Sequence, residues 1–179
     1  MGLLEAISLM KKTHPDIHVQ VDWYGKDFIE DRSPNSLKKS QLSNEINKRS
    51  LHNVFRLHEP SKEVVSLLQE TDALCLPSFY EGCANVICEA MACGKPVLAS
   101  RVGDNAMLVE EGVNGLLFSP HDPNDIARAI VAFYFLSSEK KIEFGKNSRC
   151  RAESLFSDTQ FLDNYLAIIN NRLEWLNNK

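Results

Sequence analysis

The sequence has no apolar run long enough to cross a membrane and no signal-peptide pattern at its start. A membrane-spanning helix needs about 18–20 predominantly apolar residues in a row, and a signal peptide needs a basic segment followed by an apolar one. Neither pattern occurs in the 179 residues. The sequence therefore predicts a soluble, cytoplasmic domain whose membrane contact is at most peripheral, at the inner membrane face.

Clustered positive charge is also missing. Lys and Arg together number 20, against 24 Asp and Glu, so the formal net charge is -4. The Lys-Lys pairs that begin at positions 11 and 38 are isolated, whereas nucleic-acid-binding domains carry a basic patch or stripe. The composition therefore predicts no nucleic-acid partner.

The cysteines are too few and too scattered for a disulfide framework or a zinc site. Five are present, an odd number, with no C-x-x-C pair and no paired histidines. Cys83, Cys88 and Cys93 step by five residues, which is roughly 140° around a continuous helix, so they would not share one ligand face. We expect buried free thiols in a reducing compartment and no metal.

Apolar runs alternate with helical periodicity along the chain, with no repeat, linker or low-complexity tract. This order predicts an α/β fold, a Rossmann-like parallel sheet of about six strands with helices on both faces, as a single domain over residues 1–179. Strands are expected at 17–24, 53–57, 72–77, 97–100 and 116–118. Helices are expected at 2–12, 36–50, 61–68, 86–93, 105–111, 125–136, 138–147 and about 158–176.

Residues 78–96 form the central stretch of this pattern. They lie between two short apolar runs and contain a helix of about two turns, for which Asn85 is the expected N-cap. Gly94, followed two residues later by Pro96, is a C-terminal stop signal. Strand, helix and strand make one βαβ unit. Lys95 lies beyond the stop and is expected to be solvated.

The turn that opens this helix predicts a phosphate site. Helix N-termini in such a unit lie at the carboxyl edge of the sheet, where free N–H groups and the helix dipole favour an anion. The free groups would be those of Gly82, Cys83, Ala84 and Asn85. Glu81 and Glu89 bracket the turn, and carboxylates accept hydrogen bonds from sugar hydroxyls. The predicted ligand is a nucleotide diphosphate that carries a sugar.

These residues resemble the retaining glycosyltransferases of family 4 (group 1), which have two Rossmann-like domains in the GT-B arrangement. The match consists of Glu-x7-Glu at Glu81 and Glu89, Pro-Ser-x-x-Glu-Gly before it, Glu-Ala-Met-Ala-Cys-Gly-Lys-Pro-Val after it, and a later Glu-Gly-Val-Asn-Gly-Leu-Leu-Phe. The resemblance implies that the chain is the C-terminal, donor-binding half of such an enzyme.

The resemblance also implies the chemistry. Glu81 would face the donor sugar as the catalytic residue, Glu89 would bind the ribose, and the backbone of 82–85 would bind the diphosphate. The parent protein would transfer a hexose from a nucleotide diphosphate sugar to a glycan or lipid-linked acceptor, with retention, in polysaccharide biosynthesis. No cofactor and no metal are implied, because the helix dipole and basic side chains would stabilise the departing diphosphate.

The sequence departs from the family pattern at three positions. Met1 stands where the family has a Lys that binds the diphosphate, so we expect a chain truncated at its N-terminus, without the N-terminal GT-B domain. His58 stands where the family usually has Gly, in the loop beside the nucleotide base, so a base contact and an exposed loop histidine remain alternatives. Met107 occupies the place of a Glu, while Asp104 or Asn105 is expected to cap the following helix.

The last helix carries a broad apolar face. In GT-B enzymes the C-terminal helix crosses onto the N-terminal domain, which would account for this face, and simple packing on its own domain is the alternative. Three other functions remain open: a sugar-nucleotide epimerase of GT-B fold, a flavodoxin-like domain, and a non-catalytic nucleotide-binding module.

Overall fold

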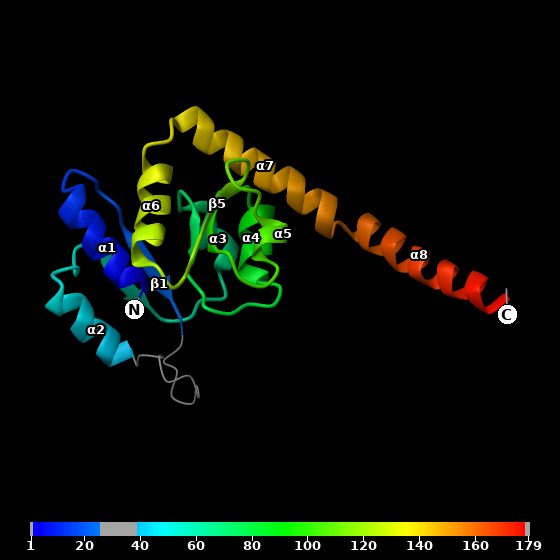
Figure 1. The fold of residues 1–179 in the computed structure, drawn as a ribbon, viewed down its shortest axis with the longest axis horizontal. Helices are drawn as coiled ribbons and strands as arrows, with labels where there is room; N and C mark the ends of the chain where they lie inside the picture. Colours follow the sequence, from blue (N-terminus) through cyan, green and yellow to red (C-terminus); the bar gives the residue numbers. More distant parts are fainter. Residues whose placement is uncertain (1, 26–38, 178–179) are drawn as a thin grey trace.

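The computed structural model describes residues 2–25 and 39–177, in which helices and strands alternate (Figure 1). The elements are α1 (Gly2–Thr13), β1 (Val21–Tyr24), α2 (Lys39–Lys48), β2 (Phe55–His58), α3 (Val64–Gln69), β3 (Leu74–Leu76), α4 (Asn85–Ala92), β4 (Val97–Ser100), α5 (Asn105–Leu108), β5 (Gly115–Phe118), α6 (Pro123–Tyr134), α7 (Ser138–Phe156) and α8 (Asp158–Asn177). The expected α/β class is confirmed. Met1 and residues 36–38, which begin the helix expected at 36–50, lie outside the described residues.

All strand pairs are parallel. β1 pairs with β2, and β3, β4 and β5 pair in that order. The described residues contain five strands in two sheets, one of two strands and one of three, rather than the expected single sheet of about six strands. The physical reason is that this part of the chain supplies only five apolar runs of strand length between its helices.

Helices cover both faces of the three-stranded sheet. Alternate residues of a strand point to opposite faces, and here Leu98 and Phe118 join a core cluster with α1 and α6. Val97, Ala99 and Leu117 join a second cluster with α4 on the other face. All four residues of β4 are buried because helices pack on both of its faces.

Helix α4 ends as the sequence predicts but begins one residue early. Gly94 has φ +69°, its N–H donates to Met91 O, and the Lys95 N–H donates to Ala90 O. This pair of hydrogen bonds is a Schellman motif, which confirms the stop signal. The N-cap is Ala84, which has no side-chain capping bond, so the assignment of Asn85 as N-cap is wrong.

Helix α7 continues to Phe156, nine residues beyond the predicted end at 147. Its buried residues recur every four positions at Phe144, Ser148 and Ala152. Ser and Ala give a weak apolar signal, so packing rather than hydrophobic pattern sustains the second half of the helix. α5 is shorter than predicted, ending at Leu108.

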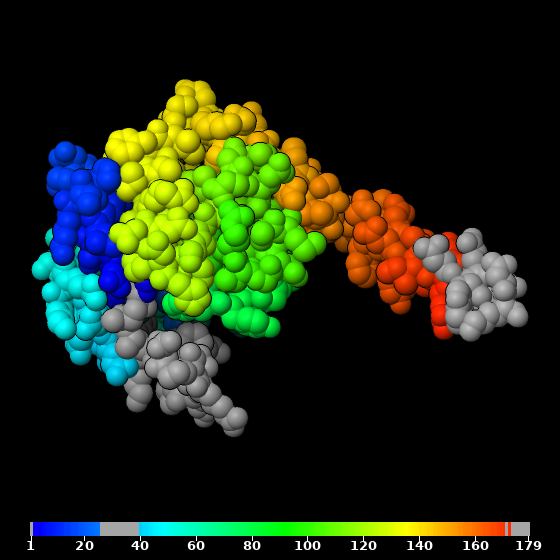
Figure 2. All heavy atoms as spheres, in the orientation of Figure 1, coloured from blue at the N-terminus to red at the C-terminus, as the bar shows by residue number. Residues whose placement is uncertain are grey.

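Helix α8 leaves the body of the molecule and extends away from it (Figures 1 and 2). Its aromatic and aliphatic side chains between 161 and 169 are 40–68% exposed. They are Phe161, Leu162, Tyr165, Leu166, Ile168 and Ile169. The alternative in which this helix packs on its own domain is therefore wrong for these side chains. No helix among the described residues is long and apolar enough to cross a membrane.

Candidate functional site

The candidate site is the β3–α4 loop, residues 77–84, together with the first turn of α4. β3 ends at Leu76 and α4 begins at Asn85, so the loop leaves the sheet at its carboxyl edge. Glu81 is half-buried, Gly82 and Cys83 are exposed, and Ala84 is buried. The buried Ala84 anchors the loop at the start of the helix, while the residues before it face solvent.

The N-terminus of α4 has free hydrogen-bond donors. Its N-cap, Ala84, has an extended conformation with φ −76° and ψ 102° and offers no side-chain acceptor. Within residues 2–25 and 39–177, the backbone N–H groups of 82–85 donate to no protein acceptor. The sequence analysis assigned these four groups to a diphosphate, and the fold places them at one exposed helix end.

Glu81 and Glu89 lie on either side of this helix start. Glu81 is half-buried in the loop, and Glu89 is exposed on α4, on the side away from the buried Ile87, Ala90 and Met91. Neither carboxylate has an ion pair or a side-chain hydrogen bond within the described part of the chain. Both therefore have their full acceptor capacity available to a ligand.

Gly103 supports the loop from the neighbouring strand, a role that the sequence analysis missed. It follows β4 with φ +49°, and a Cβ at this position would lie 2.0 Å from Glu81 O. The next residue, Asp104, donates its N–H to Gly82 O at 3.3 Å. The only sequence signal was a glycine shortly after a strand, because the contact joins loops that are distant along the chain.

Asp104 and Asn105 differ from the predicted caps. Asp104 occupies the N-cap position of α5 but makes no side-chain capping bond. Asn105 is fully buried, and its Nδ2 donates to Ser100 O at 2.9 Å. Asn105 therefore ties the end of β4 to the start of α5.

His58 is the last residue of β2 and is held by two neighbours on β1. Its Nε2 lies 2.7 Å from Asp22 Oδ1, and its ring stacks on Tyr24 with centroids 4.5 Å apart and planes 11° apart. Burial acts to raise the pKa of Asp22, but hydrogen bonds from Gln20 and His58 and the nearby positive charges outweigh it and hold that pKa below its ordinary value. The ring is thus fixed at the carboxyl end of β2.

Aromatic side chains line the solvent side of the loop. Phe79 is 51% exposed and lies against His121, with ring centroids 5.1 Å apart. Tyr80 is 86% exposed. Both aromatic side chains therefore face solvent next to Glu81 in the sequence.

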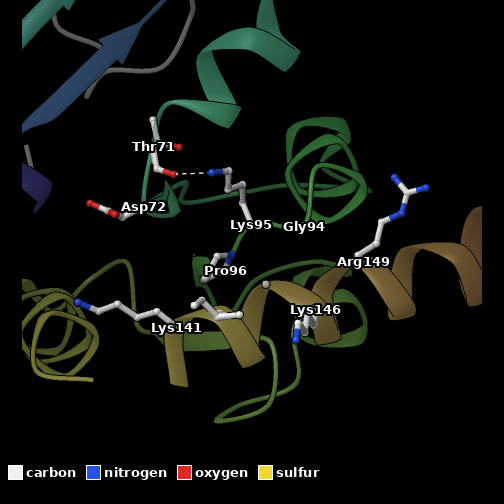
Figure 3. A pocket seen from close by; sticks show the side chains of 10 residues that line it. Thr71, Asp72, Gly94, Lys95, Pro96, Lys141, Lys146 and Arg149 are labelled. Atoms are coloured by element: carbon white, nitrogen blue, oxygen red, sulfur yellow. Dashed lines mark hydrogen bonds between the residues drawn. The ribbon is translucent and has the colours of Figure 1, made fainter. Parts of the chain in front are cut away.

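The cavity of about 410 Å³ that the structure contains lies at the opposite, amino edge of the sheet (Figure 3). Two of the lysines that line it, Lys95 and Lys141, have structural partners. Lys95 Nζ donates to Gln69 O and Thr71 O at 2.9 and 2.8 Å, so the prediction that Lys95 is solvated is wrong. Lys141 Nζ donates to Tyr134 O at 2.9 Å. These lysines bind the carbonyl ends of helices, so the cavity is separate from the candidate site.

The cysteines are free but not uniformly buried. Cys83 and Cys150 are exposed, so the prediction of buried thiols is wrong for these two. Burial raises the pKa of Cys75 in β3 to about 12. Among the described residues, no group of three or more His, Cys, Asp or Glu side chains could hold a metal ion.

A family model described as "Glycosyl transferases group 1" matches residues 2–134. Among curated proteins, the chain is 31% identical over 134 residues to D-inositol 3-phosphate glycosyltransferase of Arthrobacter sp. (strain FB24), covering 74% of this chain and 30% of that protein. It is 30% identical over 171 residues to spore coat protein SA of Bacillus subtilis, covering 93% of this chain and 44% of that protein. The chain thus spans less than half the length of these relatives.

Solved structures share the fold at lower identity. Anabaena Alr3699/HepE, solved in complex with UDP, superposes with a TM-score of 0.80 at 23% identity, over 95% of this chain and 44% of that one. The C-terminal domain of the group 1 family glycosyl transferase LpcC from Francisella tularensis gives a TM-score of 0.69 at 20% identity, over 88% of this chain and 78% of that one. The second match is to a C-terminal domain, which agrees with the fold expected here.

Proposed function

The chain belongs to the group 1 glycosyl transferases, and from this premise we propose that its β3–α4 loop binds the diphosphate of a nucleotide-sugar donor. The observation that carries the proposal is the start of α4, where an exposed N-terminus without a side-chain cap presents unpaired N–H groups between two unpaired carboxylates. A diphosphate would accept from these N–H groups and interact with the positive end of the helix dipole.

In the proposed reaction a hexose moves from the nucleotide diphosphate sugar to a glycan or glycolipid acceptor, with retention at the anomeric carbon. Glu81 would contact the sugar as the catalytic residue, and Glu89 would bind the ribose hydroxyls. The donors of Gly82, Cys83, Ala84 and Asn85 would stabilise the charge that develops on the leaving diphosphate. No metal or other cofactor is part of the proposal.

The nucleotide base would lie at the carboxyl end of β2. His58 is already oriented there, because its Nε2 lies 2.7 Å from Asp22 Oδ1 and its ring stacks on Tyr24. An oriented ring can contact a planar base without losing side-chain freedom on binding. The base contact therefore remains our proposal for His58.

The partner of this domain would be the N-terminal domain of a GT-B enzyme in the cytoplasm, with an acceptor bound between the two. Exposed apolar side chains on α8, such as Phe161 and Tyr165, support a covering partner, since large exposed apolar patches mark interaction surfaces. We also propose that the whole protein acts in polysaccharide biosynthesis, by adding a hexose to a surface glycan. These statements concern the whole protein, of which the chain spans a part.

Calorimetric titration with UDP, GDP and ADP tests the proposal. We expect one nucleotide to bind selectively, and we expect Glu89→Ala to weaken it about tenfold through the loss of charge-assisted hydrogen bonds to the ribose. The matched control is Glu70→Ala, which removes an exposed carboxylate next to the C-terminal end of α3, at the amino edge. Equal affinity in the wild type and Glu89→Ala, or failure of all three nucleotides to bind at millimolar concentration, would contradict the proposal.

A further inference from the structure

Two cysteines meet at the start of α4. Because Ala84 is the N-cap, Cys83 occupies the position before the cap and Cys88 the fourth position of the helix. Side chains at these two positions pack against each other in the hydrophobic staple. Here both positions of the staple carry thiols, and, after burial, the neighbouring Cys83 is one of the causes that raise the pKa of Cys88.

The two thiols differ in their surroundings. Cys83 is exposed, while Cys88 is half-buried. Burial raises the pKa of Cys88 to about 11, and the charge of a Cys83 thiolate adds to the rise. An oxidant would therefore meet the exposed Cys83 first, and the half-buried Cys88 second.

We propose that Cys83 and Cys88 form a reversible disulfide, and that its formation weakens nucleotide binding at the β3–α4 loop. The first half of this proposal depends on the thiol pair alone. The second half rests on the proposed function of the loop. Disulfides in reducing compartments are usually transient and redox-sensing, which fits a pair at an exposed helix start.

The reaction balances with a low-molecular-weight disulfide such as glutathione disulfide as oxidant. The Cys83 thiolate attacks one sulfur of glutathione disulfide, whose S–S bond breaks, and one glutathione leaves and takes up a proton. The Cys88 thiol loses its proton to solvent and attacks the Cys83 sulfur, which releases the second glutathione. The two protein thiols lose two electrons, and glutathione disulfide gains them to become two thiols.

Disulfide formation would move the loop rather than the helix. An S–S bond is about 2.05 Å long, shorter than any thiol hydrogen bond, so the two sulfurs must approach each other. Helix α4 is anchored in the core by Ile87, Ala90 and Met91, each 0% exposed. Cys83 has no such anchor, so its backbone shifts, and with it the N–H groups proposed to bind the diphosphate.

The remaining cysteines do not offer the same pair. Cys75 lies in β3, where burial raises its pKa to about 12, and Cys93 lies at the other end of α4 as its C-cap. The sequence argument that spaced the cysteines around a continuous helix missed the pair because Cys83 precedes the helix. Its backbone position, not helical periodicity, brings it to Cys88.

The test equilibrates the whole chain in buffers of increasing glutathione disulfide to glutathione ratio, followed by peptide mass mapping and titration with UDP, GDP and ADP. We expect a Cys83–Cys88 cross-link, a loss of affinity of about tenfold for the nucleotide that the reduced protein binds, and recovery of both after dithiothreitol. Cys93→Ser, the matched control on the same helix, should behave like the wild type. Cys88→Ser should carry at most a glutathione adduct on Cys83.

The readouts separate the two halves of the proposal. Free Cys83 and Cys88 in a fully oxidising buffer, or either cysteine cross-linked to another residue, would overturn the disulfide. A Cys83–Cys88 cross-link with affinity within twofold of the reduced protein would overturn the effect on binding. If the reduced protein binds none of the three nucleotides, the proposed function fails together with that effect, while the mass map still decides the disulfide.

Discussion

The helix C-termini at one edge of the sheet are hydrogen-bonded to cationic side chains, whereas several helix N-termini at the other edge have no side-chain cap. At the amino edge, the last carbonyls of four helices accept hydrogen bonds from cationic side chains. These are Lys95 to Gln69 O of α3, Arg149 to α4, Arg151 to α5 and Lys141 to α6. Three of the four cations come from α7, which lies along these helix ends. The negative ends of the helix dipoles are thus compensated within the protein.

At the carboxyl edge, helices α3, α4 and α5 begin without a side-chain capping bond. The start of α6, which follows β5 at the same edge, is capped by the side chain of Asp122, and α7 is capped by Ser137. Some helix N-termini, which carry partial positive charge, therefore have no side-chain cap, whereas the C-termini of α3, α4, α5 and α6 are hydrogen-bonded to cationic side chains. Of the three uncapped starts, only α4, with eight residues, combines this with exposed N–H groups and flanking carboxylates. This difference between the two ends of the helices is the reason why we propose that the start of α4 binds an anion from outside the chain.

The largest effect is expected from Gly103→Ala, which disturbs the β3–α4 loop at the carboxyl edge. The added Cβ would lie 2.0 Å from Glu81 O, and φ is +49°, so the β3–α4 loop must move. We expect a loss of about 2–3 kcal/mol in the free energy of unfolding and at least a tenfold loss of nucleotide affinity, measured by urea denaturation and calorimetry.

Gly112→Ala is the matched control for this change. Gly112 also has a positive φ of +76°, but a Cβ there meets nothing within 4 Å. It should cost about 1 kcal/mol through backbone strain alone and leave nucleotide affinity unchanged. Equal affinities for the two variants would contradict the role of Gly103.

A middle-sized effect is expected from Lys95→Met, which acts on the amino edge. The change removes two hydrogen bonds to the carbonyls of Gln69 and Thr71, at 2.9 and 2.8 Å. We expect the free energy of unfolding to fall by about 1–2 kcal/mol, with nucleotide affinity unchanged. Lys146→Met, on the same cavity wall but exposed, should stay within about 0.5 kcal/mol. A loss of nucleotide affinity in Lys95→Met would show that the two edges are not separate.

The smallest effect is expected from Asp22→Asn, beside the proposed base site. The pKa of Asp22 is below its ordinary value of 3.8 in the folded state, so its contribution is present above that value and is lost as the pH falls through the folded-state pKa. Because both side chains are partly exposed, we expect only about 0.5–1 kcal/mol at pH 7.

Denaturation of the wild type and Asp22→Asn between pH 7 and pH 2 measures this contribution. The difference in the free energy of unfolding should shrink as the pH drops below about 4. A difference that grows towards low pH would contradict the sign, because it would mean that folding raises the pKa of Asp22.

Local signals made the central βαβ unit predictable, whereas contacts between distant segments were not. Gly94 and Pro96 are a local stop signal in the sequence, and they predicted the end of α4. The second half of α7 was missed because Ser148 and Ala152, which it buries, are too small and polar to produce an apolar stripe. The partners of Lys95 lie 24 and 26 residues away, so no pattern around the lysine could reveal them.

The candidate site divides in the same way. The motif around Glu81 and Glu89 identified the loop and the N–H groups, because helix starts follow from local sequence. The support by Gly103 and the orientation of His58 by Asp22 depend on the register of neighbouring strands. The predicted N-cap was Asn85, whereas the observed N-cap is Ala84. Alanine is not a favoured N-cap residue, so the sequence held no local signal for it.

Assigned amide NMR spectra during titration with UDP, GDP and ADP test the central claim most directly. The account predicts that the backbone amides of 82–85 show the largest shifts, while those of Gly94 and Gly145 at the amino edge stay in place. Shifts centred on Gly94, Gly145 and the neighbouring lysines, with 82–85 unchanged, would contradict it, because the anion would then bind at the edge where the helix ends are already compensated.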